Sequence, residues 1–81
     1  MMMTEKSWTT NTGEAANYIF STNALNSLQF DIENGYLDKQ DGFCDCDHMD
    51  TWWDITDIKE TSESVSITVK TEYEEYILIY S

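Results

Sequence analysis

The residues that could carry out metal chemistry are concentrated in one short segment of the chain. Cys44-Asp45-Cys46-Asp47-His48 brings two thiols, one imidazole and two carboxylates together within five residues. In an extended backbone successive side chains alternate in direction, so Cys44, Cys46 and His48 would project to the same side. Thiolate and imidazole groups are the ligands that zinc prefers in proteins. The spacing therefore admits a metal site at these three residues.

The rest of the chain does not complete such a site. Structural zinc sites usually place about two to four residues between paired cysteines, and they take about four ligands. No second pair of Cys or His residues exists in the sequence. The alternative is two half-buried cysteines in a turn beside an exposed histidine, and we favour it. We therefore predict no metal and no cofactor.

Catalysis by carboxylates is a second kind of chemistry to consider. Paired carboxylates can act as acid and base, and His48 lies between Asp47 and Asp50. However, the chain has no arginine to clamp a substrate and no glycine-rich phosphate loop. A chain of 81 residues also has only a modest core in which to build a pocket. We therefore predict that the protein is not an enzyme.

The charge of the chain is its strongest chemical signal. It has 16 Asp and Glu residues against four Lys, and a formal net charge of −12. Residues 31–60 hold ten of the acids and two of the lysines. A net charge of about 2–8 in magnitude suffices for the solubility of a small domain, and excess like charge destabilises the compact state. A basic partner would compensate this charge, whereas nucleic acids and anionic membranes require clustered Lys and Arg.

We predict that the partner-binding face combines these acids with an aromatic residue. Trp52 and Trp53 would face opposite ways on a strand, so only one can enter the core from the covered face. The other would be exposed between Asp50 and Asp54, as large aromatic residues are at interface hot spots. Burial of both tryptophans is the alternative. The predicted partner-binding residues are Asp31, Glu33, Asp38, Asp41, Asp45, Asp47, Asp50, Trp52, Trp53, Asp54 and Asp57.

Helical signals lie in the first half of the chain, within a helical region of about residues 14–34. Leu25, Leu28 and Ile32 have helical spacing over 22–34, Ser21 or Thr22 can cap the start, and Gly35 can cap the end. Residues 6–21 are open to two interpretations: a helix that extends this stripe, or a hairpin between residues 8–10 and 18–20. We favour the helix.

Strand signals occupy the second half of the chain. Alternation of apolar and polar residues predicts a strand at about 64–73, and a run of apolar residues predicts another at about 75–81. Residues 51–60 are expected to form a third strand, and Tyr73, Tyr76 and Tyr80 are expected to lie in the sheet. The last strand is apolar on both faces, which is typical of a central strand. Residues 35–50 are predicted to form an acidic loop region. The predicted fold is a single α+β domain, with an antiparallel sheet of three to four strands covered by one or two helices.

These features resemble a class of phage-encoded acidic inhibitors, the anti-CRISPR and anti-restriction proteins of the DNA-mimic type. The resemblance rests on size, architecture, the absence of Arg, and seven aspartates with one lysine between Asp38 and Asp57. It implies stoichiometric inhibition of a host-defence complex in the host cytoplasm, in which carboxylates occupy the basic groove that holds DNA or RNA. The alternative is an immunity- or antitoxin-like protein that neutralises a basic toxin, or an acidic assembly adaptor.

Overall fold

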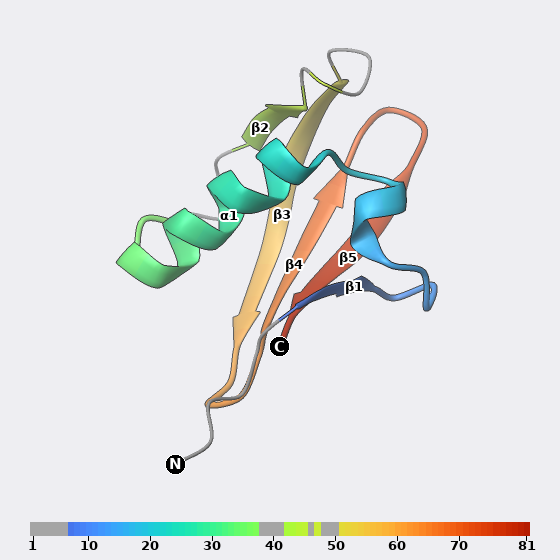
Figure 1. Ribbon diagram of the computed structural model, residues 1–81. Coiled ribbons are helices and arrows are strands. Elements are labelled where there is room, and N and C mark those ends of the chain that lie inside the picture. The colour runs from blue at the N-terminus through green and yellow to red at the C-terminus, as the bar shows by residue number, and fades with distance from the viewer. Residues whose placement is uncertain (1–6, 38–41, 46, 48–50) are drawn as a thin grey trace.

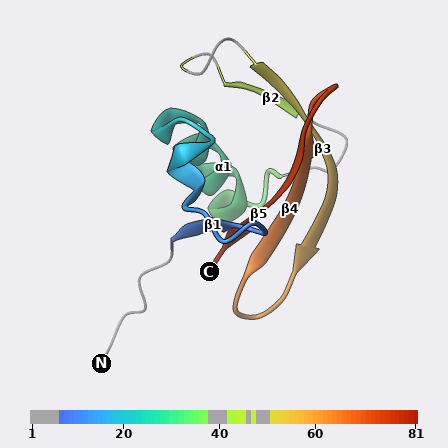
Figure 2. The same ribbon diagram turned by 90° about the vertical axis from the view of Figure 1, so that its right-hand side faces the viewer.

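The structure is a computed structural model, and it describes residues 7–37, 42–45, 47 and 51–81. Five strands form one antiparallel sheet in the order β1-β5-β4-β3-β2, and one helix packs across one of its faces (Figures 1 and 2). This is a small α+β domain, as predicted, with more strands than expected. The elements are β1 (Trp8–Thr10), the 3-10 helix η1 (Ala16–Tyr18), α1 (Thr22–Asn34), β2 (Gly42–Asp45), β3 (Thr51–Glu60), β4 (Val65–Lys70) and β5 (Glu75–Tyr80).

The helix α1 has the bounds and the caps that the sequence predicts. The Oγ atom of Ser21 accepts a hydrogen bond from the backbone N–H of Ala24 at 3.1 Å, which satisfies one of the free donors at the helix start. Gly35 ends the helix in the left-handed conformation, at a φ of 72°. Leu25 and Leu28 are buried against the sheet. Local signals therefore determine this element.

Both interpretations of the segment before α1 are wrong. Only a single 3-10 turn forms, at Ala16–Tyr18, and β1 pairs with β5 instead of with residues 18–20. Asn11 explains this preference, because its backbone N–H donates to the carbonyl oxygen of Ile77 at 3.0 Å. Its side-chain Oδ1 accepts from the N–H of Ile77 at 3.0 Å. These two bonds continue the β1–β5 ladder past the end of the strand.

The predicted acidic loop region also contains a strand, so that prediction is wrong for β2. Cys44 lies opposite Trp52, and Asp45 lies opposite Thr51, in the antiparallel pairing of β2 with β3. The parts of this prediction that fall on residues 38–41, 46 and 48–50 lie outside the described residues. β5 has neighbours on both sides, β1 and β4, which confirms the prediction of a central strand.

A β-bulge in β3 decides which of its side chains meet the helix. The register with β4 shifts between Ile55 and Asp57, so Thr56 is an extra residue in the strand. Strict alternation from Trp53 and Ile55 would point Asp57 into the core. The bulge instead places Asp57 opposite Thr68, on the uncovered face, and Ile58 on the covered one. The sheet thus keeps a carboxylate out of the core.

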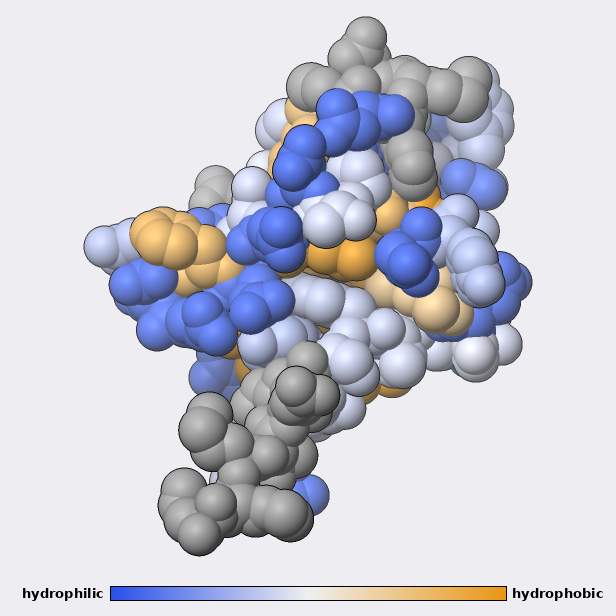
Figure 3. Space-filling view, viewed as in Figure 1, coloured by the Kyte–Doolittle hydropathy of each residue, from blue (hydrophilic) through white to orange (hydrophobic). Residues whose placement is uncertain are grey.

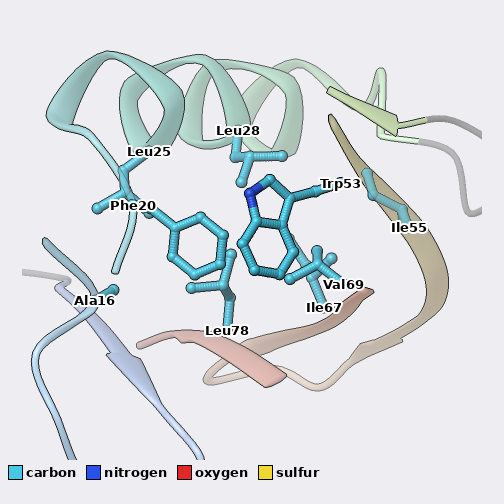
Figure 4. Packing of buried hydrophobic residues seen from close by; sticks show 9 residues of the cluster. All are labelled: Ala16, Phe20, Leu25, Leu28, Trp53, Ile55, Ile67, Val69 and Leu78. Carbon is cyan, nitrogen blue, oxygen red and sulfur yellow. The ribbon is translucent and has the colours of Figure 1, made fainter. Parts of the chain in front are cut away.

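The core lies between α1 and the covered face of the sheet (Figure 4). Phe20 packs against Trp53 with ring centroids 4.7 Å apart and ring planes tilted by 53°, and Leu28, Ile67 and Leu78 are buried around them. Trp53 retains 3% exposure, whereas Trp52 is 55% exposed. The prediction that one of the two tryptophans enters the core is therefore confirmed.

Candidate functional site

Trp52 is an exposed aromatic residue that is fixed in place. Its indole Nε1–H donates to Oδ1 of Asp54 at 2.7 Å. Its ring lies against Gly42 on the neighbouring strand, where an added Cβ would stand 2.5 Å from Cζ2 of the indole. A glycine at this position is therefore required for the ring to occupy it. The indole therefore packs against the backbone of β2, while Trp52 remains 55% exposed.

The turn between β4 and β5 presents a second exposed aromatic residue. The backbone N–H of Thr71 donates to the carbonyl oxygen of Glu74 at 2.8 Å. Oγ1 of Thr71 accepts from the N–H groups of Tyr73 and Glu74 at 3.1 and 3.0 Å. None of these bonds uses the side chains at positions 72 and 73. Tyr73 is 89% exposed, so its predicted place within the sheet is wrong.

Trp52 and Tyr73 line one groove, which we call the Trp52–Tyr73 groove. It has a volume of about 560 Å³ and lies at the upper end of the sheet in Figure 1, where β3 begins and β4 turns into β5. Among the residues that the structure describes, its lining has two aromatic residues, three carboxylates and no lysine: Thr51, Trp52, Asp54, Thr71, Glu72, Tyr73 and Glu74. Lys70 lies opposite Asp54 and Glu75 in the register, but it lines a neighbouring hollow.

The helix-covered face of the sheet also has a groove lined by aromatic residues and carboxylates at this end. A groove of about 450 Å³ is lined by Tyr18, Ile19, Asp47, Thr51, Trp53, Glu74 and Tyr76, so it shares Thr51 and Glu74 with the first groove. Burial raises the pKa of Tyr76 above its ordinary value, and the nearby carboxylates of Glu74 and Glu14 raise it further. Carboxylates and aromatic rings therefore surround this end of the sheet on both sides.

Two of the predicted partner-binding residues are internal. Asp45 is 1% exposed, and its Oδ2 accepts a hydrogen bond from the backbone N–H of Ser21 at 2.9 Å. Its carboxylate therefore satisfies a donor just before α1 and is not offered to a partner. Trp53 belongs to the core. Asp45 is therefore not on an exposed binding face, so that prediction is wrong for this residue, and Trp53 is the tryptophan of the pair that enters the core.

The remaining predicted residues do not form one face. Asp47, Trp52 and Asp54 lie at the grooved end of the sheet. Glu33 lies near the opposite end, where its Oε2 accepts from the hydroxyl of Tyr80 at 3.4 Å. Asp31 is also on the last turns of α1, and Asp57 is on the uncovered face of β3. The predictions for Asp38, Asp41 and Asp50 lie outside the described residues.

The sequence interpretation missed Glu72, Tyr73 and Glu74. A signal for them exists, because two short links of the same form, Thr61-Ser62-Glu63-Ser64 and Thr71-Glu72-Tyr73-Glu74, join the last three strands. Tyr is an unusual residue for the middle of a polar hairpin turn, where Gly, Asn, Asp and Ser are preferred. That contrast marks Tyr73 as a residue that the turn itself does not require.

The metal alternative receives no support from the described part of the chain. Cys44 is exposed and lies opposite Trp52, while Cys46 and His48 lie outside the described residues. Among the residues that are described, no three His, Cys, Asp or Glu side chains gather in a metal-binding cluster. Within the same residues, no helix combines the length and the apolar character needed to cross a membrane.

The helix side of the molecule shows hydrophobic patches among hydrophilic residues (Figure 3). It has exposed aromatic residues of its own, Phe30 on α1 and Tyr36 just beyond the end of the helix, whose ring centroids lie 6.1 Å apart. No protein-family model, curated protein or solved structure matches the chain. The grooved end of the sheet is therefore the candidate site on physical grounds: it can attract a cation through carboxylates and contact it with aromatic rings.

Proposed function

We propose that the protein is a non-catalytic inhibitor that occupies the basic nucleic-acid groove of another protein, such as a CRISPR or restriction complex in a host cytoplasm. The Trp52–Tyr73 groove is the observation that supports this proposal. In the described part of the chain, its lining combines three carboxylates with two exposed aromatic rings and holds no lysine. The chain around it carries a net charge of −12.

The charge supports a basic partner because it lies on the surface. Twelve of the acidic residues are among the described residues, and Asp45 is the one among them that is buried. Only Lys59 and Lys70 oppose them in this part of the chain. DNA carries about one negative charge per 1.7 Å of its axis, and proteins that bind it present clustered Lys and Arg. A surface of the same sign gains the same long-range attraction to such a groove.

The exposed aromatic residues favour a specific protein contact over a role in solubility alone. A surface that only keeps a protein soluble needs charge and has no use for large exposed aromatic side chains. Trp and Tyr are enriched among the residues that dominate binding energy in protein interfaces. Trp52 is also held by Asp54 and Gly42, so little of its side-chain freedom remains to be lost on binding.

A matched pair of charge-reversal variants tests this proposal. Glu72→Lys/Glu74→Lys changes the grooved end, and Glu60→Lys/Glu63→Lys makes the same change in net charge at the opposite end, at exposed positions in both cases. Each protein is immobilised and used to capture partners from bacterial lysate at low and high salt. We expect the first variant to lose a nucleic-acid-binding protein by about tenfold or more, and the second to retain it.

Two further measurements decide the nature of the captured partner. Duplex DNA or RNA should displace it, and the purified partner should lose its nucleic-acid binding at a one-to-one ratio with the wild-type protein. Equal loss in both variants would show that net charge alone drives capture, which contradicts the proposal. A basic toxin that nucleic acid does not displace would instead support the immunity-like alternative.

A further inference from the structure

We propose that the Trp52–Tyr73 groove binds an arginine side chain of the partner, with the guanidinium stacked on Trp52 and paired with a groove carboxylate. This inference rests on the proposed function and adds the chemistry of the contact. It commits to one occupant, an arginine on a basic protein segment. The argument depends on the geometry of the two rings, on the charge of the lining, and on the difference between Arg and Lys.

The two aromatic rings offer faces that folding leaves unused. An added Cβ at Gly42 would stand 2.5 and 2.8 Å from Cζ2 and Cε2 of Trp52, so the indole packs directly on the Gly42 backbone. Its solvent side accounts for its 55% exposure. Tyr73 is 89% exposed across the same groove. A cation over the face of a Trp or Tyr ring is attracted by its quadrupole.

The described lining of the groove carries carboxylates and no cation of its own. Asp54 uses Oδ1 to accept from the Trp52 indole, which holds this carboxylate beside the ring. The Glu72 side chain makes no hydrogen bond to any residue that the structure describes. The nearby cation is Lys70, which lies between Asp54 and Glu75 in the sheet register and outside the groove lining. The groove is therefore complementary to one added positive charge.

Arginine fits this combination better than lysine does. A guanidinium is planar, stacks on aromatic faces and donates two parallel hydrogen bonds to one carboxylate. A lysine ammonium is a compact and strongly hydrated charge that loses more on leaving water. The volume of about 560 Å³ is also large enough to admit the side chain together with part of the segment that carries it.

Three short peptides serve as the probe: acetyl-Gly-Gly-Arg-Gly-Gly-amide and its Lys and citrulline analogues. Citrulline has the shape of arginine without its charge. The readout is the ¹⁵N–¹H signal of the Trp52 indole, assigned with Trp52→Phe, at low salt. We expect saturable shifts with the Arg peptide, binding at least twofold weaker with Lys, and no saturable shift with citrulline.

Variants then separate the aromatic contribution from the charge. Tyr73→Phe should keep the affinity for the Arg peptide, and Tyr73→Leu should weaken it about two- to fivefold, the range of an exposed cation–π contact. Glu72→Gln should weaken this affinity more than Glu63→Gln does, because Glu63→Gln removes the same charge from the other turn, at the opposite end of the sheet. All four substitutions are at exposed turn positions, so folding should be preserved.

Equal binding of the Arg and Lys peptides, together with no effect of Tyr73→Leu, would show an electrostatic surface without an arginine site and would overturn this inference. The outcome of this peptide test can be told apart from the outcome of the partner-capture experiment that tests the proposed function. An arginine preference without any partner that nucleic acid displaces would contradict the proposed function alone. Capture of such a partner without an arginine preference would contradict this inference alone.

Discussion

Two hairpin turns of this sheet have the same backbone but different exposed side chains. In each, the first Thr donates its N–H to the carbonyl oxygen three residues later at 2.8 Å, at Thr61 in one turn and Thr71 in the other. In each, the Thr Oγ1 also accepts from the two backbone N–H groups that follow, at 3.0 to 3.2 Å. The middle residues are Ser62 and Glu63 in the β3–β4 turn, and Glu72 and Tyr73 in the β4–β5 turn.

The comparison separates what the fold requires from what it allows. The shared hydrogen bonds come from the Thr side chain and the backbone, so they do not require particular side chains in the middle of the turn. Ser62 and Glu63 are ordinary choices for a polar turn. Tyr73 is not, and its turn lies beside the exposed Trp52. The fold does not explain Tyr73, so a contact outside the fold is the better explanation.

The largest expected effect on stability comes from removing the support under Trp52. Gly42→Ala would bring a Cβ within 2.5 Å of the indole and 2.7 Å of the Trp53 carbonyl oxygen. We expect the free energy of unfolding to fall by about 1–3 kcal/mol, the usual cost of overpacking. Urea denaturation followed by tryptophan fluorescence would measure it. The β3–β4 end has no such ring, so this cost is specific to the grooved end.

A double-mutant cycle identifies the source of that cost. In a Trp52→Ser background the indole is absent, and Gly42→Ala should cost less than it does in the wild-type protein. An unchanged cost would mean that the Trp53 backbone, and not the indole, forbids a side chain at position 42. The description of Gly42 as the support of Trp52 would then be wrong.

A smaller effect is expected from each turn threonine, and it should be the same at the two ends. Thr61→Ala and Thr71→Ala each remove a hydroxyl that accepts two backbone N–H groups. Both turns are exposed, so water can replace part of this, and we expect a loss of about 1 kcal/mol in each case. Urea denaturation would show whether they match. A difference above about 1 kcal/mol would contradict the equivalence of the two turns.

Local sequence signals predicted α1 and the three strands of the second half of the chain. The helix α1 follows from the spacing of Leu25, Leu28 and Ile32 between a Ser cap and a Gly cap, and its bounds agree with the prediction. The three strands of the second half follow from their alternating pattern. Short polar links leave those strands no arrangement other than hairpins. Each of these signals lies within about ten residues of the element that it determines.

The rest depends on contacts between distant residues. β1 pairs with β5 at the other end of the chain, and Asp45 accepts from the backbone of Ser21, 24 residues earlier. No local pattern distinguishes that carboxylate from the exposed Asp47. The groove was missed for the same reason, since Trp52 and Tyr73 line one groove only because β3, β4 and β5 run alternately up and down. Composition identified an acidic protein but not the end of the sheet where Trp52 and Tyr73 lie.

Tyr76 and Tyr80 of β5 lie toward opposite ends of the sheet, and both should make the free energy of unfolding depend on pH. Burial raises the pKa of both above 10.0; Glu74 and Glu14 add to this at Tyr76, and Glu33 at Tyr80. The folded state therefore keeps protons that the unfolded state releases once the pH exceeds about 10. We expect the free energy of unfolding to be unaffected by these groups below pH 9 and to fall as the pH rises through the folded pKa values. Urea denaturation at pH 8 to 11 measures this fall.

Phenylalanine variants show how much of the fall in the free energy of unfolding at high pH comes from each of the two tyrosines. Tyr76→Phe and Tyr80→Phe each remove one ionisable hydroxyl, so each should flatten the pH dependence above pH 10, and the double variant should flatten it most. Repulsion among the acidic residues is common to all of these proteins and cancels in the comparison. If the slopes above pH 10 were identical in the wild-type protein and the double variant, the two tyrosines would not be the source.

The smallest expected change in stability comes from exchanging the middle residues of the two turns. Ser62→Glu/Glu63→Tyr together with Glu72→Ser/Tyr73→Glu leaves composition and net charge unaltered, and it keeps two carboxylates in the β4–β5 turn. Since neither turn uses these side chains in its backbone hydrogen bonds, the free energy of unfolding should stay within about 0.5 kcal/mol of wild type. The preference of the Trp52 indole signal for the Arg peptide over the Lys peptide should nevertheless fall, by about the two- to fivefold worth of one aromatic contact. A stable exchanged protein that keeps the full preference would show that the position of Tyr73 beside Trp52 has no part in recognition. Loss of the preference at constant charge would show that the middle residues of this turn, Glu72 and Tyr73, take part in it, and Tyr73→Leu then gives the share of the ring.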